Sequence, residues 1–216
     1  MARTLRLDLV HPLCSNQDIK VIKEVLDTGG IIGIPTDTFY GLGANPLNEE
    51  AVQTIYRIKK RPANKPFTIL VDSVKTLNNF VSGITTDMEK LMGAFWPGPL
   101  TILFSVMPLM PPKLSAYTGK IGARIPDHVV TRYLLEKIGH PLTGTSANIS
   151  ESENTTTAAE VEKVLGPQLN LIIDGGKSPG GKESTVIDPT VSPPVIIREG
   201  AIPREEIESE LGTKCA

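Results

Sequence analysis

SNQDIKVIKEVLDTGGIIGI, residues 15–34, predicts a helix followed directly by a buried strand. Ser15 and Asp18 have the spacing of a capping box, in which each side chain bonds to the backbone of the other residue, so a helix should begin here. Gly29-Gly30 is a typical helix stop, and residues 31–34 form a short apolar run of strand type. The apolar residues of the helix recur at helical spacing: Ile19, Ile22, Val25 and Leu26.

The same alternation continues along the chain. A second helix should begin after Asn48, carry the basic pair Lys59-Lys60 in its last turn and be stopped by Pro62. Capping boxes at Thr86/Glu89 and Thr157/Glu160 predict the starts of two later helices. Further helices are predicted at 86–95, 128–138, 158–165 and 204–211, and further strands at 67–71, 101–106, 121–124, 141–145, 171–174, 184–188 and 195–198.

The order of these elements predicts the fold class. Helices and strands alternate without a clean βα repeat, and several strands near the C-terminus follow one another with no helix between them. This order favours an α/β fold on a mixed sheet with flanking helices. No linker divides the 216 residues, so we expect a single domain over 1–216 with its core at about 15–200.

Composition excludes several classes of protein. A net charge of −2 argues against a surface coated with basic residues for nonspecific nucleic-acid binding. Cys14 and Cys215 have neither disulfide-framework nor zinc-site spacing, which fits a reduced cytosolic compartment. The N-terminus is a poor signal peptide and no apolar run is long enough to span a membrane, so a cytoplasmic location is expected.

Two segments have the chemistry of a phosphate site. KKRPANKP (59–66) contains four cations in seven residues, which suit a polyphosphate but also suit a basic helix end followed by a solvated loop. TGTSANIS (143–150) follows a predicted strand, and its small polar residues leave backbone amides accessible to a phosphate. A polar turn closed by its own Ser and Asn side chains explains it equally well.

Other segments are less specific. PTDTFYGLG (35–43) places two hydroxyls, a carboxylate and a phenol on one turn. From Gly176 the chain resembles GxxxxGK, but Glu183 stands where a P-loop needs Ser or Thr and a strand follows, so a Walker-type site is rejected. The glycines there favour a mobile loop over a ligand. Trp96 is predicted to be a core anchor, and the scattered His11, His128 and His140 to be surface or capping groups.

Taken in order, seven segments resemble the YrdC/Sua5 family. They span residues 34 to 200, and each is modest alone while the ordered set is highly specific. The segments are IPTDTFYGLG (34–43), Lys59 and Arg61 with Lys65-Pro66, FWPGPLT (95–101), GARIPDH (122–128), Ser146 and Asn148 in TSANIS, STVID (184–188) and IIREG (196–200).

The resemblance implies a twisted sheet with a concave, basic face. It also implies a short-form threonylcarbamoyl-AMP synthase, a nucleotidyltransferase that converts L-threonine, bicarbonate and ATP into L-threonylcarbamoyl-adenylate and pyrophosphate. The product would serve N6-threonylcarbamoylation of adenosine 37 in tRNA, which a separate transferase completes. Mg²⁺ is expected to enter with ATP, and weak binding to tRNA stays open.

The resemblance also assigns roles to residues. Lys59, Arg61, Ser146 and Asn148 match the family's catalytic tetrad. Two changes depart from the usual family pattern: Leu70 stands where many members have His, and Asn154 where a small hydroxyl residue is common. ATP is expected to contact Arg61, Lys65, Ser146, Asn148, Asn154 and Arg198, and threonine is expected to contact Thr38, Arg124 and Ser184.

Two other functions stay open. An RNA-binding module could use the same basic cleft for tRNA or double-stranded RNA, although the acidic net charge and the few aromatic residues argue against RNA as the main ligand. Carbamoyl transfer in hydrogenase maturation uses a related domain, but those proteins carry zinc-finger-like cysteine pairs that this sequence lacks.

Overall fold

The computed structural model describes residues 3–6, 15–62, 65–108, 110–150 and 152–216. His11 and Cys14, which the sequence analysis considered, lie outside the described residues. In the part of the chain that is described, no helix is long and apolar enough to cross a membrane.

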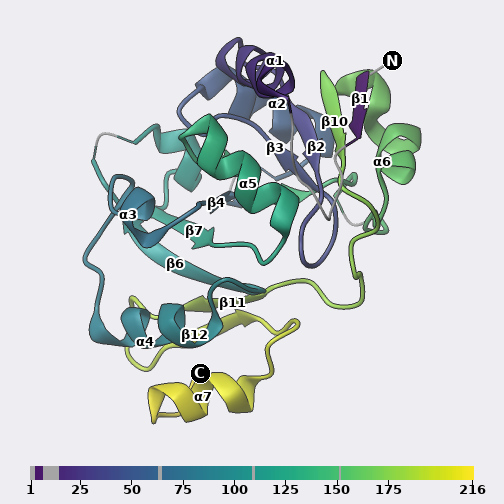
Figure 1. Cartoon of the computed structure of the whole chain (residues 1–216). Helices are drawn as coiled ribbons and strands as arrows, with labels where there is room; N and C mark the ends of the chain where they lie inside the picture. The colour runs from purple at the N-terminus through teal and green to yellow at the C-terminus, as the bar shows by residue number, and fades with distance from the viewer. Residues whose placement is uncertain (1–2, 7–14, 63–64, 109, 151) are drawn as a thin grey trace.

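Strands in the described residues form two mixed sheets, and the predicted α/β class is confirmed (Figure 1). Each sheet combines parallel and antiparallel pairs. The first sheet has the order β1 (Arg3–Arg6), β10 (Leu171–Asp174), β2 (Ile32–Ile34), β3 (Gly41–Gly43) and β9 (Thr145–Ser146). The second has the order β12 (Val195–Arg198), β11 (Thr185–Asp188), β6 (Leu100–Val106), β7 (Lys120–Arg124), β4 (Thr68–Leu70) and β8 (Leu142–Thr143), and β5 (Val81–Ser82) pairs with β6.

Most helices begin and end where the local sequence predicts. Ser15 and Thr157 form the predicted capping boxes. The third predicted box is wrong by one residue, because Thr85, and not Thr86, accepts the Met88 N–H and caps its helix. The α-helices are α1 (Asn16–Asp27), α2 (Glu49–Lys59), α3 (Val74–Leu77), α4 (Thr86–Phe95), α5 (Val129–Ile138), α6 (Ala158–Leu165) and α7 (Arg204–Leu211), with 3-10 turns at Pro112–Ser115 and Gly166–Gln168.

One predicted strand, 141–145, is wrong as a single element. The chain forms β8 in the second sheet and then β9 in the first, with Gly144 between them. The Thr143 N–H donates to Ala44 O, and the Gly144 N–H donates to Thr68 O, 2.7 Å away. A Cβ on Gly144 would lie 2.6 Å from Leu70 Cγ, so any larger residue at this crossing would force the Leu70 side chain to shift.

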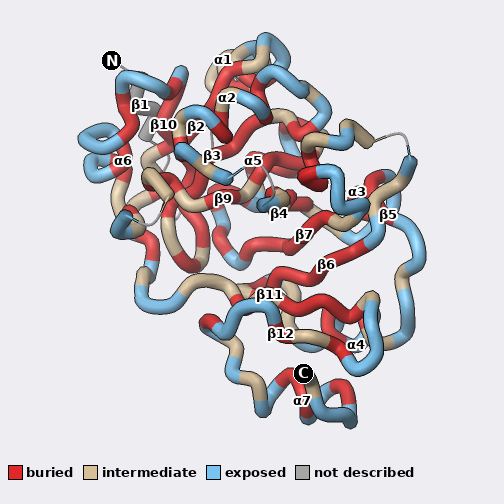
Figure 2. The backbone as a smooth tube through the Cα atoms, turned by 180° about the vertical axis from the view of Figure 1, so that it is seen from behind, coloured by how far each residue is buried: buried red, intermediate tan, exposed pale blue. Residues whose placement is uncertain are grey.

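Helices cover both faces of the first sheet. On one face, α1 and α5 pack through Ile22 and Leu134 against Ile32. On the other face, α2 and α6 contribute Ile55 and Val161 to a larger core. Figure 2 shows the consequence, since β2 and β3 are buried while the outer surfaces of α1 and α6 are exposed.

The second sheet divides its side chains by strand alternation. The residues that point to one face belong to the core shared with α4 and α7, among them Ile69, Ile102 and Ala123. The alternate residues on the same strands line a cleft: Thr68, Leu70, Thr101, Leu103, Gly122 and Arg124. Trp96, as predicted, packs against this core, and its Nε1 donates to Leu100 O, 2.7 Å away.

Replacing Gly144 tests the crossing between the sheets. Gly144→Ala should lower the free energy of unfolding by about 1–3 kcal/mol, because the new methyl group overlaps Leu70 in a packed core. Urea denaturation measures this loss. Gly93→Ala is the control, since a Cβ there meets nothing within 4 Å and alanine should stabilise α4 by roughly 0.5–1 kcal/mol. Equal effects at the two glycines would contradict this account of the crossing.

Candidate functional site

A cleft of about 720 Å³ opens on the face of the second sheet that the core leaves free. All ten residues that the sequence analysis assigned to a site line it. The cleft contains five basic side chains, from Lys59, Arg61, Lys65, Arg124 and Arg198, and Glu183 is the only acidic one among its described lining residues. The structure therefore brings the predicted residues together, while their roles stay predictions. A wider concave basic face also stays a prediction.

Lys59 is the most deeply buried of the predicted site residues. Its side chain, from the last residue of α2, is 2% exposed. The Nζ atom donates to Ser146 O, to Asn148 O (2.8 Å) and to Asn148 Oδ1 (2.9 Å). Ser146 Oγ, at 3.4 Å, is a fourth and more distant acceptor for the three N–H groups of the ammonium. Burial nevertheless lowers the pKa of Lys59 to about 7, with a further lowering by Arg61 that Glu183 opposes.

The segment after β9 is tied to Lys59 at both ends. The Lys59 carbonyl accepts the Ser150 N–H at 2.9 Å. The Ser146 hydroxyl donates to Asn148 Oδ1 at 2.6 Å, and Asn148 Nδ2 donates to Ser152 O at 2.6 Å. The sequence left two explanations open for this segment, and the observed bonds match the polar turn closed by its own side chains. The turn still presents Ser146 and Asn148 to the cleft.

Arg61 lies next to Lys59 on the wall of the cleft. Its Nε and Nη2 donate to the carbonyls of Lys65 (3.1 Å) and Pro66 (2.9 Å), and its guanidinium lies 5.3 Å from the centre of the Phe67 ring. These contacts hold the guanidinium in one orientation. The helix itself ends before Pro62, because Lys60 takes a left-handed conformation with φ of 49°.

Arg124 lies at the opposite wall, at the end of β7, and is buried. Its Nη2 lies 3.2 Å from Asp37 Oδ1 in an ion pair, although without hydrogen-bond geometry, and Nη1 donates to Asp37 Oδ2 at 3.4 Å. Nη2 also donates to the hydroxyls of Thr36 (3.2 Å) and Thr38 (3.4 Å). Burial is the largest effect on the pKa of Arg124 and lowers it, while Asp37 raises it. The predicted neighbours Thr38 and Arg124 are thus in contact.

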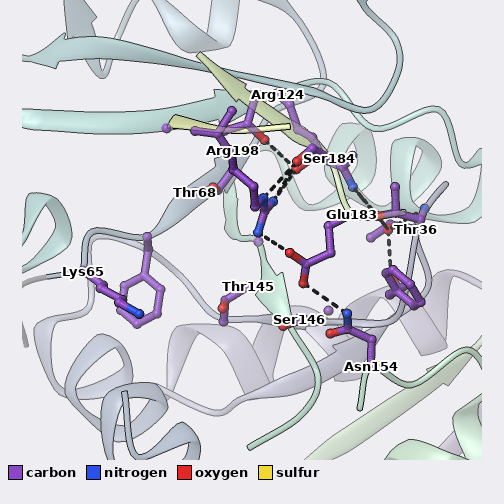
Figure 3. Close-up of a pocket in the computed structure, with 18 of the residues that line it drawn as sticks. Thr36, Lys65, Thr68, Arg124, Thr145, Ser146, Asn154, Glu183, Ser184 and Arg198 are labelled. Atoms are coloured by element: carbon purple, nitrogen blue, oxygen red, sulfur yellow. Dashed lines mark hydrogen bonds and ion pairs between the residues drawn. The ribbon is translucent and has the colours of Figure 1, made fainter. Parts of the chain in front are cut away.

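Arg198, at the end of β12, forms a third group (Figure 3). Its Nε and Nη2 donate to Ser184 O at 3.1 and 2.8 Å, and Nη2 reaches Ser184 Oγ at 3.1 Å. Its Nη1 pairs with Glu183 Oε2, and Asn154 Nδ2 donates to Glu183 Oε1 at 3.1 Å. Ser184, predicted to contact threonine together with Thr38 and Arg124, bonds to Arg198 and to Thr101 Oγ1, 3.0 Å away.

The sequence analysis gave no role to Asp37 or Glu183. Both were visible as carboxylates inside polar motifs, but their partners, Arg124 and Arg198, lie 87 and 15 residues away in sequence. No local signal reports such pairing. His128 also differs from its prediction: it occupies the N-cap position of α5 but is buried and forms no capping bond.

The glycine loop before Glu183 is bonded to neighbouring segments, and the mobility that the sequence suggested for it stays a prediction. Residues 175–182 do not line the cleft. Instead, Tyr40 Oη donates to Gly176 O at 2.7 Å, the Gly180 N–H donates to Thr38 O at 2.8 Å, and the Ser178 N–H donates to Thr156 O at 2.8 Å. Positive φ at Gly176 and Gly180 permits this bonded turn. As predicted, a strand and not a helix follows the loop, so no P-loop forms.

Fold and cleft together define a class: an α/β protein that collects cations, hydroxyls and amides in one cavity, as expected for anionic ligands. The model of the Sua5/YciO/YrdC family, described as "Telomere recombination", matches residues 24–200. This chain belongs to that family, and the resemblance found from its motifs is confirmed.

Several relatives share a name. The threonylcarbamoyl-AMP synthase of Pyrococcus abyssi is 38% identical over 194 residues, which are 90% of this chain but only 57% of that protein. The threonylcarbamoyl-AMP synthase of Vibrio campbellii is 31% identical over 186 residues, 85% of this chain and 100% of that protein. A crystal structure of P. abyssi Sua5 complexed with L-threonine superposes with a TM-score of 0.91 at 34% identity, covering 98% of this chain and 62% of that one.

The lowered pKa of Lys59 predicts a pH dependence of stability. Above pH 7 the unfolded chain keeps a proton on Lys59, whose ordinary pKa is 10.5, that the folded chain has released. Raising the pH from 7 toward 10 therefore stabilises the wild type relative to Lys59→Met, by up to about 1.4 kcal/mol per pH unit. Urea unfolding of both proteins across this range measures the difference. Lys60→Met, at an exposed neighbouring position, should keep the pH dependence of the wild type. A constant difference between wild type and Lys59→Met would contradict the assignment.

Proposed function

We propose that this chain joins L-threonine, bicarbonate and ATP into L-threonylcarbamoyl-adenylate with release of pyrophosphate. The observation that carries the proposal is one cleft with two separately organised cationic groups, one around Lys59 and Arg61 and one at Arg124. One group suits a polyphosphate and the other the carboxylate of an amino acid. The names of the relatives and the threonine complex of one of them support the same reaction.

The groups at Arg61 and Arg198 fit the nucleotide. Arg61 is held by carbonyls and a ring face, and Arg198 by Ser184, so both guanidinium groups are oriented before a ligand arrives. We assign the phosphates and the nucleoside to Arg61, Lys65, Ser146, Asn148, Asn154 and Arg198. Lys59 bonds to the turn that carries Ser146 and Asn148, so it holds two of these residues in place. The negative charge of bound phosphates would raise the pKa of Lys59 and keep it protonated beside them.

The group at Arg124 fits threonine. Its guanidinium is a fork-shaped donor suited to a carboxylate, and the Thr38 hydroxyl lies 3.4 Å from Nη2. Ser184, assigned to the same substrate, lies between Arg198 and Thr101 and would face the junction of the two ligands. Leu70 lies over Gly144 and provides an apolar wall where a polar ring is common in the family.

The proposed chemistry needs alignment more than a nucleophilic side chain. The threonine amine and bicarbonate combine to a carbamate with loss of water. A carbamate oxygen then attacks the α-phosphorus of ATP, the bond from that phosphorus to the bridging oxygen breaks, and the electron pair leaves with pyrophosphate. Charge builds up on the phosphate oxygens during this step, and fixed cations stabilise it. Arg61, Arg198 and the nearby Lys59 are the residues placed for that purpose.

We propose that Mg²⁺ arrives bound to ATP. No group of three or more His, Cys, Asp or Glu among the described residues could hold a metal ion. Glu183, the one acidic side chain among the described residues that line the cleft, is paired with Arg198 and Asn154. The donor set therefore does not fit a protein-held metal, and no step is assigned to protein ligands of Mg²⁺.

The product would be consumed by a transferase that moves the threonylcarbamoyl group to adenosine 37 of tRNA. We propose this step from the family resemblance and the shared name of the relatives, and a cytoplasmic location from the cysteine spacing and the N-terminal sequence.

Incubation with ATP, L-threonine and labelled bicarbonate tests the proposed reaction. Release of pyrophosphate and formation of a labelled adenylate are expected, each dependent on threonine. The same protein is then titrated with tRNA. Tight tRNA binding without adenylate formation would contradict the enzyme and support the RNA-binding alternative.

Removing Arg61 should reduce catalysis. Arg61→Ala is expected to cut adenylate formation by roughly 10²-fold or more, because a preoriented cation is lost from the phosphates. Pyrophosphate release measures the rate. Arg57→Ala is the matched control, since Arg57 is an exposed arginine of the same helix that bonds only to Thr54 in the described structure. A near-normal rate for Arg61→Ala would contradict the role of this residue.

Changing Arg124 should chiefly affect threonine. Arg124→Lys keeps a cation beside Asp37 but loses the planar pair of N–H donors that can bind both oxygens of a carboxylate. KM for threonine should therefore rise at least about tenfold while KM for ATP changes little. Arg132→Lys, an exposed arginine paired with Asp127, is the control. An unchanged KM for threonine would exclude Arg124 from its binding.

A further inference from the structure

Glu183 is an unexpected occupant of the cleft. It is the single acidic side chain among the described lining residues, and it lies with five cations. One carboxylate oxygen pairs with Arg198 Nη1, and the other accepts the Asn154 Nδ2–H at 3.1 Å (Figure 3). Its negative charge also acts on Lys59 and Arg61, because it opposes the lowering of the pKa of both residues.

The donors that Glu183 occupies are those a phosphate would use. An arginine N–H and an amide N–H bond to carboxylate and phosphate oxygens alike. Asn154 donates to Glu183 although its own Oδ1 is buried without a hydrogen-bond partner in the described structure. The carboxylate is therefore a reason for Asn154 to hold its present orientation toward Arg198.

From this geometry we propose that the Glu183 carboxylate occupies, on Arg198 and Asn154, the hydrogen-bond donors that a nucleotide phosphate uses when it binds. It holds Arg198 and Asn154 in position before a nucleotide binds, and an incoming phosphate displaces it. Glu183 is thus a positioning residue that also weakens nucleotide binding, since its contacts must break first. This role rests on the proposed function, which requires ATP in the cleft.

The contacts around Arg198 allow such an exchange. Three bonds from Nε and Nη2 to Ser184 do not involve Glu183, so the guanidinium keeps its place when the carboxylate leaves. When the Glu183 carboxylate leaves, Nη1 is the only nitrogen of the Arg198 guanidinium that loses a partner, and Asn154 Nδ2 also becomes free to donate. The pair is also only half-buried, with 44% and 37% of the two side chains exposed, and ion pairs in such positions are weak. Displacement is therefore easy, and repulsion between Glu183 and a phosphate favours it.

Calorimetric titration of ATP without threonine tests the proposal on the wild type, Glu183→Gln and Glu199→Gln. Glu183→Gln removes the charge that competes for Arg198 and should bind ATP roughly three- to tenfold more tightly. Inorganic pyrophosphate should show a gain of the same direction. Glu199→Gln is the matched control, because Glu199 follows Arg198 directly but pairs with Arg204 outside the cleft. It should bind ATP within about twofold of the wild type.

A double variant separates occupation of Arg198 from a general effect of charge. In an Arg198→Ala background the gain from Glu183→Gln should disappear, and a gain that persists would overturn the proposal. Weaker ATP binding by Glu183→Gln with unchanged pyrophosphate binding would mean direct contact with the nucleoside, and would also overturn it. ATP binding by the wild type without a gain in Glu183→Gln would refute this inference and leave the proposed function intact. If neither the wild type nor Glu183→Gln binds ATP, both this inference and the proposed function are refuted.

Discussion

The burial of the Lys59 ammonium is the interaction around which the cleft is built. An isolated buried charge is costly, and here four oxygen atoms of Ser146, the last residue of β9, and of Asn148 in the following turn accept hydrogen bonds from it. The same residue accepts the Ser150 N–H through its carbonyl, so the end of α2 and the turn form one unit. β9 belongs to the first sheet, and Lys59, Ser146 and Asn148 all line the cleft, so this unit joins the first sheet to the cleft lining.

The second sheet supports this arrangement by separating two tasks on the same strands. Ile69, Ile102 and Ala123 bury one face in the core, and their neighbours in sequence line the cleft. A shift of one residue in register would exchange the two sets and destroy both core and cleft. Gly122 and Gly144 lack side chains that would project from this face into the cleft, and a Cβ on either would lie less than 3.0 Å from a neighbouring side chain.

Local sequence signals predicted much of the fold, whereas features that depend on pairing between distant residues could not be predicted. The caps at Ser15, Asn48 and Thr157 marked helix starts because a cap acts within three residues. The division of 141–145 between two sheets was not predictable in this way, since it depends on strands far away in sequence. The same holds for β3, whose glycine-rich segment has little strand propensity. The ten site residues came from the order of motifs along the chain, whereas their partners Asp37 and Glu183 became visible only in three dimensions.

Arg124 and Arg198 both line the cleft and are each paired with a carboxylate, but the two pairs differ in burial. The side chains of Arg124 and Asp37 are 6% and 10% exposed, and an arginine in that position needs a permanent counter-charge, because loss of its partner leaves an uncompensated buried cation. Arg198 is 44% exposed and can exchange partners at little cost. On the proposed function, a threonine carboxylate would join Asp37 at Arg124, whereas a phosphate would replace Glu183 at Arg198. The same pairing thus makes a fixed site for the small substrate and an exchangeable one for the nucleotide.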